Sequence, residues 1–211
     1  MIRYKILTKP LLVLVLILSL TGCQSPSSPN KAGEAEQSSR MDGSPKILMV
    51  IAPQDFRDEE YQEPRDIFED NDYQVEVASI QTGTAVGVNG AEVEINTTTD
   101  QASPDDYEAV VFVGGPGMAQ ITKDETLSLL AQNFYQKEKL TTAICVAPAI
   151  LARAGILDNK KATSFPNAKK DLESGGAEFT GDKVTVDGRI ITANGPEAAA
   201  EFAQTIISRL E

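Results

Sequence analysis

Long apolar runs alternate with amphipathic segments along most of the chain. Residues 46–52 and 109–113 are almost continuously apolar, which is typical of parallel strands buried on both faces. Residues 140–144 form a third such run that is rich in β-branched side chains. Residues 73–77 alternate between apolar and polar side chains, which predicts a further strand.

Helical patterns separate these strands. The first follows residues 46–52, and Pro64 within it is expected to kink the helix or to begin a second segment. Thr122 and Glu125 have the spacing of a capping box, and apolar positions in residues 127–134 share one helix face. A last helix is predicted over residues 195–210, with an apolar stripe along it.

Two turn signals predict β-hairpins, one at Asn89-Gly90 and one at Asp187-Gly188. Residues 161–164 are a short strand candidate. Strands that alternate with helices predict an α/β fold, a three-layer sandwich in which helices cover both faces of a mostly parallel sheet. The two hairpins are expected to be local antiparallel additions to it.

Cys145 directly follows the run at residues 140–144, and Pro148 predicts that a helix begins just after it. A thiol at such a turn faces the unpaired N–H groups of a helix start, which favour the thiolate. The alternative is a small buried core thiol. Because ligands of open parallel sheets bind at the carboxyl ends of the strands, the loops after residues 46–52 and 109–113 are expected beside Cys145. The expected meeting of these two loops with Cys145 favours a functional site over a buried core thiol.

A reactive sulfur at this position needs help from a neighbouring side chain. A helix N-terminus contributes about 0.3–1 kcal/mol, which is less than the roughly 1.4 kcal/mol that corresponds to one pH unit of pKa. Asp58, Glu59 and Glu60 are the candidate neighbours. An ionised carboxylate raises a thiol pKa, whereas a protonated one donates to the thiolate and lowers it. We therefore expect one buried acid with an elevated pKa and a thiol pKa well below that of free cysteine.

Backbone N–H groups near the thiol are candidates for an oxyanion hole. Gly114 and Gly115 allow close approach of the backbone to a ligand, and the N–H of Val146 follows the sulfur directly. The alternative is that the Gly-Gly-Pro-Gly run at residues 114–117 is simply a turn.

The first 22 residues have the pattern of an export signal, with basic residues followed by an apolar run at residues 11–20. This run is about half of the roughly 20 residues needed to span a bilayer. It ends in Leu-Thr-Gly-Cys, which resembles the lipobox of bacterial lipoproteins and implies a lipid on Cys23. We therefore divide the chain into a signal peptide (1–22), a lipidated cysteine with a disordered tether (23–45) and a folded domain (46–211). The expected location is a cell or outer membrane, with the domain outside the cytoplasm.

Composition narrows the function further. The net charge of −12 disfavours nucleic acid as a partner. The chain has no histidine, which excludes a Ser-His or Cys-His couple within one subunit and disfavours a zinc site. We predict neither a metal nor an organic cofactor. With Cys23 lipidated, Cys145 has no disulfide partner within the chain.

Four motifs resemble, in order, those of the ThiJ/PfpI family; they lie at residues 56–64, 114–117, 143–148 and 194–196. This resemblance implies a flavodoxin-like fold of the class I glutamine amidotransferase type. By position it also implies that Cys145 is the reactive cysteine, that Glu60 is a protonated glutamate against its sulfur, and that Gly115 and Val146 donate to an oxyanion. Family members are commonly homodimers, so a homodimer is expected here.

The chain departs from the family where relatives carry histidine. Val146 follows the cysteine where the peptidase-like branch has a histidine, and Phe165 precedes a proline where other relatives have one. A cysteine peptidase or amidase is therefore disfavoured, and Phe165 is expected to make the site more apolar. The resemblance leaves a glyoxalase- or deglycase-like activity on small reactive carbonyls or their adducts. The alternatives are a cysteine-oxidation stress sensor or chaperone, and a binding module without chemistry.

Overall fold

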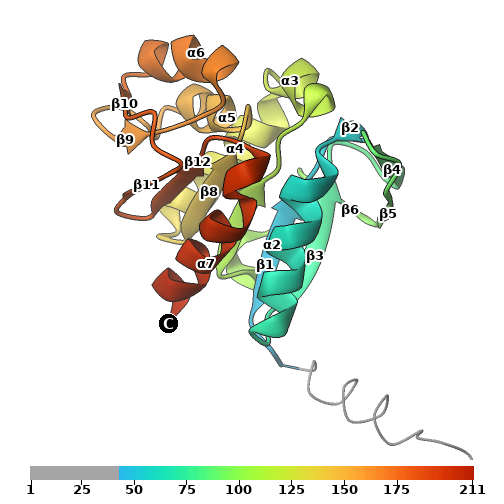
Figure 1. Ribbon diagram of the computed structural model, residues 1–211. Coiled ribbons are helices and arrows are strands. Elements are labelled where there is room, and N and C mark those ends of the chain that lie inside the picture. The colour runs from blue at the N-terminus through green and yellow to red at the C-terminus, as the bar shows by residue number, and fades with distance from the viewer. Residues whose placement is uncertain (1–42) are drawn as a thin grey trace, which may run out of the picture.

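The computed structural model describes residues 43–211, and Figure 1 shows how they are arranged. The predicted signal peptide, Cys23 and nearly all of the predicted tether lie outside these residues. Within them, a seven-stranded sheet has the order β11-β12-β8-β7-β1-β3-β6, and its pairs are parallel except for β11 against β12. The mostly parallel α/β sheet predicted from the sequence is confirmed.

The strands of this sheet begin and end close to the predicted apolar runs. They are β1 (Lys46–Val50), β3 (Gln74–Ser79), β6 (Thr97–Thr98), β7 (Ala109–Phe112), β8 (Leu140–Ile144), β11 (Val184–Asp187) and β12 (Ile190–Ala193). Two small sheets lie beside it, formed by β2 (Gln54–Phe56), β4 (Gly83–Gly87) and β5 (Glu92–Ile95), and by β9 (Lys161–Ala162) and β10 (Glu178–Phe179).

Helices cover both faces of the main sheet. Helices α2 and α7 pack side by side on one face, and α4 packs against β7 and β8 (Figure 1). The apolar strands β1, β7 and β8 in the middle of the sheet are buried at every residue except Lys46 at the start of β1. The helices are α2 (Asp58–Asp70), α3 (Pro116–Ile121), α4 (Glu125–Gln136), α5 (Pro148–Arg153), α6 (Lys169–Ser174) and α7 (Ala199–Leu210).

Helix α2 continues through Pro64, which is buried, so that no second segment begins there. Two other local expectations are wrong. The hairpin of β11 and β12 is not a local addition, because β12 pairs with β8 inside the main sheet. Thr122 does not cap α4: it ends α3, a helix that the sequence did not predict, and the Asp124 side chain accepts the N–H of Thr126 instead.

The loops that follow β1, β7 and β8 lie together at the carboxyl end of the parallel strands. Because β1, β7 and β8 run in parallel, their carboxyl ends bring α2, α3 and α5 together. Within residues 43–211 none of the helices is long and apolar enough to cross a membrane, and no cluster of acidic or cysteine side chains is arranged to hold a metal ion.

Candidate active site

Cys145 occupies a tight turn between β8 and α5. Its φ of +65° is unusual for a residue with a side chain. Two backbone hydrogen bonds maintain this conformation: its N–H donates to the carbonyl of Ala193 at 2.9 Å, and its carbonyl accepts the N–H of Phe165 at 2.7 Å. The neighbouring strand β12 and the loop after β9 therefore fix the turn, and the thiol is 7 % exposed at the carboxyl edge of the sheet.

The Glu60 side chain meets this thiol from the first turn of α2. It is completely buried. Its Oε2 accepts the N–H of Gly114 at 3.0 Å, and the carboxyl group faces the thiol of Cys145. Among the described residues, its Oε1 has no further hydrogen-bond partner. A buried carboxyl group that lacks a cationic partner for a direct ion pair is costly to ionise.

Burial accordingly dominates the acidity of both groups. It raises the pKa of Glu60 to about 7, against the opposing effects of the Cys145 thiol, the Gly114 N–H and the Arg57 guanidinium. Burial and the negative charge of Glu60 raise the pKa of Cys145 to about 12, although the N–H groups of Gly115 and Val146 act in the other direction. Over the pH range between these values the pair holds one proton.

The elevated pKa that the sequence predicts for one buried acid is thus confirmed, but the low pKa that it predicts for the thiol is not. A helix N-terminus and a neutral acid, which the sequence does reveal, both favour the thiolate. The depth of burial disfavours a charged sulfur, as does the charge that Glu60 acquires above about pH 7, and neither can be read from the sequence. The thiolate therefore depends on Glu60 taking the proton.

Gly114 and Gly115 bring α3 against the pair. A Cβ at Gly114 would lie 2.5 Å from both the Cβ of Cys145 and the Oε2 of Glu60, so a side chain does not fit there. Gly115 has φ +115°, and a Cβ there would lie 2.6 Å from the backbone N of Arg57 and from the carbonyl oxygen of Asp55. The N–H of Gly114 is already donated to Glu60, so the prediction that it joins the oxyanion hole is wrong. Gly115 and Val146 direct their N–H groups at the sulfur.

Two residues just before Glu60 contribute to the site: Arg57, which the sequence analysis does not name, and Asp58, which is one of its candidate neighbours. The Arg57 guanidinium lowers the pKa of Glu60, and its buried Nε has no hydrogen-bond partner among residues 43–211. Asp58 accepts the N–H groups of Asn89 at 2.8 Å and Ala91 at 3.0 Å, and thereby attaches the β4–β5 hairpin to the start of α2. The acidic run at residues 58–60 was the available signal, but the partners of Asp58 are more than 30 residues away.

Phe165 lies beside the turn, as expected from its place in the sequence. Its backbone holds the Cys145 carbonyl, while its side chain is 43 % exposed. The ring lines a hollow of about 440 Å³ together with Pro166, Phe179 and Pro196. That Phe165 makes the surroundings of the Cys145 sulfur more apolar stays a prediction.

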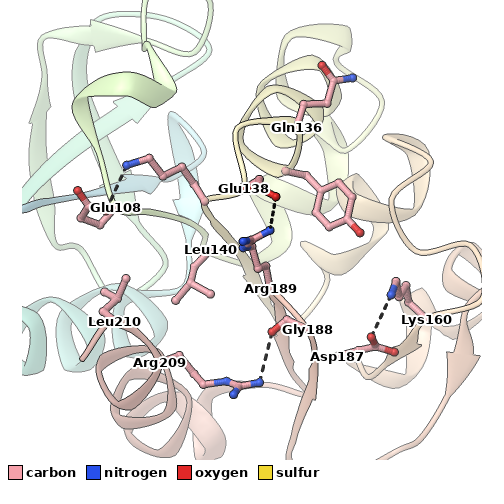
Figure 2. Close-up of a pocket in the computed structure, with 12 residues that line it drawn as sticks. Glu108, Gln136, Glu138, Leu140, Lys160, Asp187, Gly188, Arg189, Arg209 and Leu210 are labelled. Carbon is pink, nitrogen blue, oxygen red and sulfur yellow. Dashed lines mark hydrogen bonds and ion pairs between the residues drawn. The ribbon is translucent and has the colours of Figure 1, made fainter.

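A second and larger hollow, of about 920 Å³, lies at the amino ends of β7, β8 and β12, opposite to the end of the strands where Cys145 lies (Figure 2). Its charged side chains are engaged with one another: Lys139 with Glu108, Arg189 with Glu138 and Lys160 with Asp187, as shown by the dashed lines. It is therefore remote from the chemistry at Cys145, and its charges are largely balanced.

Comparison with known proteins places the chain in a family. The model of the DJ-1/PfpI family matches residues 45–209. The chain belongs to the DJ-1/PfpI family. It is 39 % identical to an uncharacterized protein of Methanocaldococcus jannaschii over 96 % of this chain and 98 % of that protein. It is 30 % identical to a deglycase of Pyrococcus horikoshii over 72 % of this chain and 90 % of that enzyme.

Solved structures of the DJ-1/PfpI family share the fold. The crystal structure of a ThiJ/PfpI domain protein from Brachyspira murdochii has a TM-score of 0.77 and 34 % identity, over 80 % of this chain and 98 % of that one. Drosophila melanogaster DJ-1beta has a TM-score of 0.72 and 29 % identity, over 79 % and 90 % of the two chains. The flavodoxin-like fold implied by the sequence motifs is confirmed.

Proposed function

We propose that this protein acts on small reactive carbonyl compounds or their adducts, with Cys145 as nucleophile and Glu60 as the group that accepts and returns its proton. The observation that carries the proposal is the completely buried Glu60 carboxyl group facing the Cys145 thiol, with a pKa raised to about 7. The naming of the Pyrococcus horikoshii relative as a deglycase supports the same class of chemistry.

The first step is addition of the thiol to an aldehyde. The sulfur attacks the carbonyl carbon as its proton passes to Glu60, the C=O π bond breaks, and the electron pair moves to oxygen. The N–H groups of Gly115 and Val146, which point at the sulfur, are positioned to donate to the resulting oxyanion. Return of the proton from Glu60 to that oxygen completes a hemithioacetal.

With a 2-oxoaldehyde the reaction continues without an external oxidant. Glu60 moves a proton from the former aldehyde carbon to the former ketone carbon, so that the first is oxidised and the second reduced. Water then hydrolyses the thioester to a 2-hydroxy acid and restores the thiol. A base whose pKa lies near neutrality suits both proton transfers at physiological pH. Glu60 thus takes the role that a histidine has in other cysteine enzymes.

The membrane location is part of the proposal. Strand β1 begins at the end of the parallel strands opposite to the end where Cys145 lies. A lipid on Cys23 and a tether up to residue 45 would attach the domain to the membrane from that end. Export with Cys23→Ala is expected to release the protein from the membrane fraction. Retention of the variant there would contradict the lipid anchor.

The activity is tested with methylglyoxal as substrate and 2-hydroxy acid formation as the readout. Cys145→Ser and Glu60→Gln are expected to lower turnover at least ~100-fold, in keeping with loss of a nucleophile or of a general base. Glu59→Gln is the matched control, because it removes the same charge one residue away on an exposed side chain. Equal turnover by the wild type and all three variants would favour a binding module without chemistry instead.

A further inference from the structure

Two buried side-chain atoms in residues 43–211 lack a hydrogen-bond partner, and both lie at the start of α2. They are the Nε of Arg57 and the Oε1 of Glu60. The first is a donor and the second an acceptor. Because buried polar atoms are almost always hydrogen-bonded, an unpaired donor and an unpaired acceptor three residues apart point to a ligand that bonds to both.

The backbone of Gly114 holds these two residues together. Its carbonyl accepts the N–H of Arg57 at 3.1 Å, and its N–H donates to the Oε2 of Glu60 at 3.0 Å. Arg57 is the N-cap residue of α2 and Glu60 is the third residue of the helix, the same spacing that brings two side chains together in a capping box. The side chains are therefore neighbours. Since both atoms are unpaired, they do not bond to each other.

The chemistry of the two atoms selects a small neutral ligand. The guanidinium of Arg57 is always charged, so it disfavours a cation at this place, and the Glu60 carboxylate disfavours an anion. The ligand has to accept a hydrogen bond from Nε and donate one to Oε1. Water does both, and buried water typically bonds to polar groups that have no protein partner.

This position is one carboxyl group away from the reacting sulfur. The carboxyl group of Glu60 faces the thiol of Cys145, and a Cβ at Gly114 would lie 3.0 Å from the Sγ of Cys145 and 2.5 Å from the Oε2 of Glu60. Because Oε2 accepts the N–H of Gly114, Oε1 is the oxygen whose acceptor capacity is unused. A water on Oε1 is therefore placed beside a base and close to a carbon bound to the sulfur.

We propose that the Nε of Arg57 and the Oε1 of Glu60 hold a water molecule between them, and that this water hydrolyses the thioester on Cys145. The inference rests on the proposed function and adds the nucleophile of its last step. Arg57 acts as a positioning residue: it donates to the water oxygen and thereby orients one O–H toward Oε1.

The hydrolytic step is balanced without a further reactant. The water oxygen attacks the thioester carbonyl carbon while one of its protons passes to Oε1 of Glu60. The tetrahedral intermediate then re-forms its C=O bond and breaks its C–S bond, and the leaving sulfur takes the proton back from Glu60. The products are a 2-hydroxy acid and the free thiol of Cys145.

Two substitutions of Arg57 separate its donor from its charge. In Arg57→Gln the amide nitrogen takes the place of Nε, because both atoms are bonded to Cδ, so a donor stays and the charge is lost. In Arg57→Lys a carbon takes that place and the charge stays. With methylglyoxal, kcat should fall at least ~10-fold in Arg57→Lys and stay within ~3-fold of the wild type in Arg57→Gln, the scale of one hydrogen bond to a charged group.

The matched control is Arg153→Lys, the same substitution on an exposed side chain of α5, which should leave kcat unchanged. Equal kcat values in Arg57→Lys and Arg57→Gln, or the lower value in Arg57→Gln, would show that the donor at this place is not what matters and would overturn the inference.

The intermediate that accumulates shows which step is slowed. Addition to the aldehyde and the internal proton transfer do not use the water, so Arg57→Lys should accumulate the thioester on Cys145. Neutral hydroxylamine traps it as the hydroxamate of the 2-hydroxy acid, and more hydroxamate is expected than with the wild type. A lower kcat without more hydroxamate would place the defect before hydrolysis and contradict the role of Arg57.

A crystal structure of the wild type keeps this inference separate from the proposed function. It should show a water within hydrogen-bond distance, about 2.7–3.2 Å, of both unpaired atoms. Such a water in a protein that does not turn over methylglyoxal would refute the proposed function and the hydrolytic role, and retain only the water site. An active protein in which the two atoms bond to each other or to other protein groups would refute the water site and retain the proposed function.

Discussion

Replacing Glu60 with glutamine should make the protein more stable at alkaline pH. The amide oxygen of glutamine can still accept the N–H of Gly114, and its size matches the buried space, so the change removes an ionisation with little loss of packing. In the wild type, the folded state holds the Glu60 proton up to about pH 7, whereas the unfolded chain loses it near 4.5. The folded state thus binds more protons between these values, and its stability falls as pH rises through them.

The size of this effect follows from the difference between the two pKa values. A rise from 4.5 to about 7 spans 2.5 pH units, and each unit corresponds to about 1.4 kcal/mol. Between about pH 4 and pH 8, the free energy of unfolding of Glu60→Gln should therefore rise by roughly 3 kcal/mol relative to the wild type. This is a large part of the 5–15 kcal/mol that is typical of folded domains.

Urea unfolding of the reduced proteins at several pH values provides the measurement, with the stability difference between variant and wild type plotted against pH. Glu59→Gln is the control, because it makes the same substitution on the neighbouring, exposed side chain. If the Glu60→Gln difference changes with pH no more than the control does, the account of the buried acid is refuted.

Other side chains around the site give separate predictions. Asp58→Asn should lower the free energy of unfolding by about 1–3 kcal/mol, because the carboxylate that accepts two hairpin N–H groups is lost. Burial raises the pKa of Asp58, but these N–H groups lower it overall. The difference between variant and wild type, measured by urea unfolding, should therefore disappear as the pH falls below 3.8 and through the lowered pKa. Gly114→Ala should destabilise by about 1–3 kcal/mol through overpacking and abolish methylglyoxal turnover; a fully active Gly114→Ala enzyme would contradict the packing described for Glu60 and Cys145. Asp124→Ala should lower the Tm of the domain through loss of about 1 kcal/mol of capping, whereas Thr122→Val should change it less, and the reverse order would restore Thr122 as the cap.

The sheet and the place of the site could be predicted because both depend on local signals. Continuous apolar runs such as residues 46–50 are stable only as strands buried on both faces, and parallel strands necessarily bring their carboxyl ends to one edge. Cys145 at the end of such a run, followed by Pro148, specified a turn into a helix.

Three of the errors concern interactions between residues that are distant in the sequence. The role of β12 depends on its pairing with β8, which a hairpin signal at Asp187-Gly188 does not reveal. The direction of the Gly114 N–H depends on Glu60, which is 54 residues away. The acidity of Cys145 depends on how deeply the completed fold buries it. Local sequence propensity predicts neither this strand pairing, nor this hydrogen-bond partner, nor the depth of burial.

The central claim is that the Cys145 sulfur adds to the aldehyde carbon of a 2-oxoaldehyde. It is tested most directly by carbon-13 NMR of the protein mixed with methylglyoxal labelled at the aldehyde carbon. The account predicts a protein-bound hemithioacetal signal in the wild type that is absent in Cys145→Ser and that forms more slowly in Glu60→Gln. An absent signal in the wild type, or an equal signal in Cys145→Ser, would contradict it.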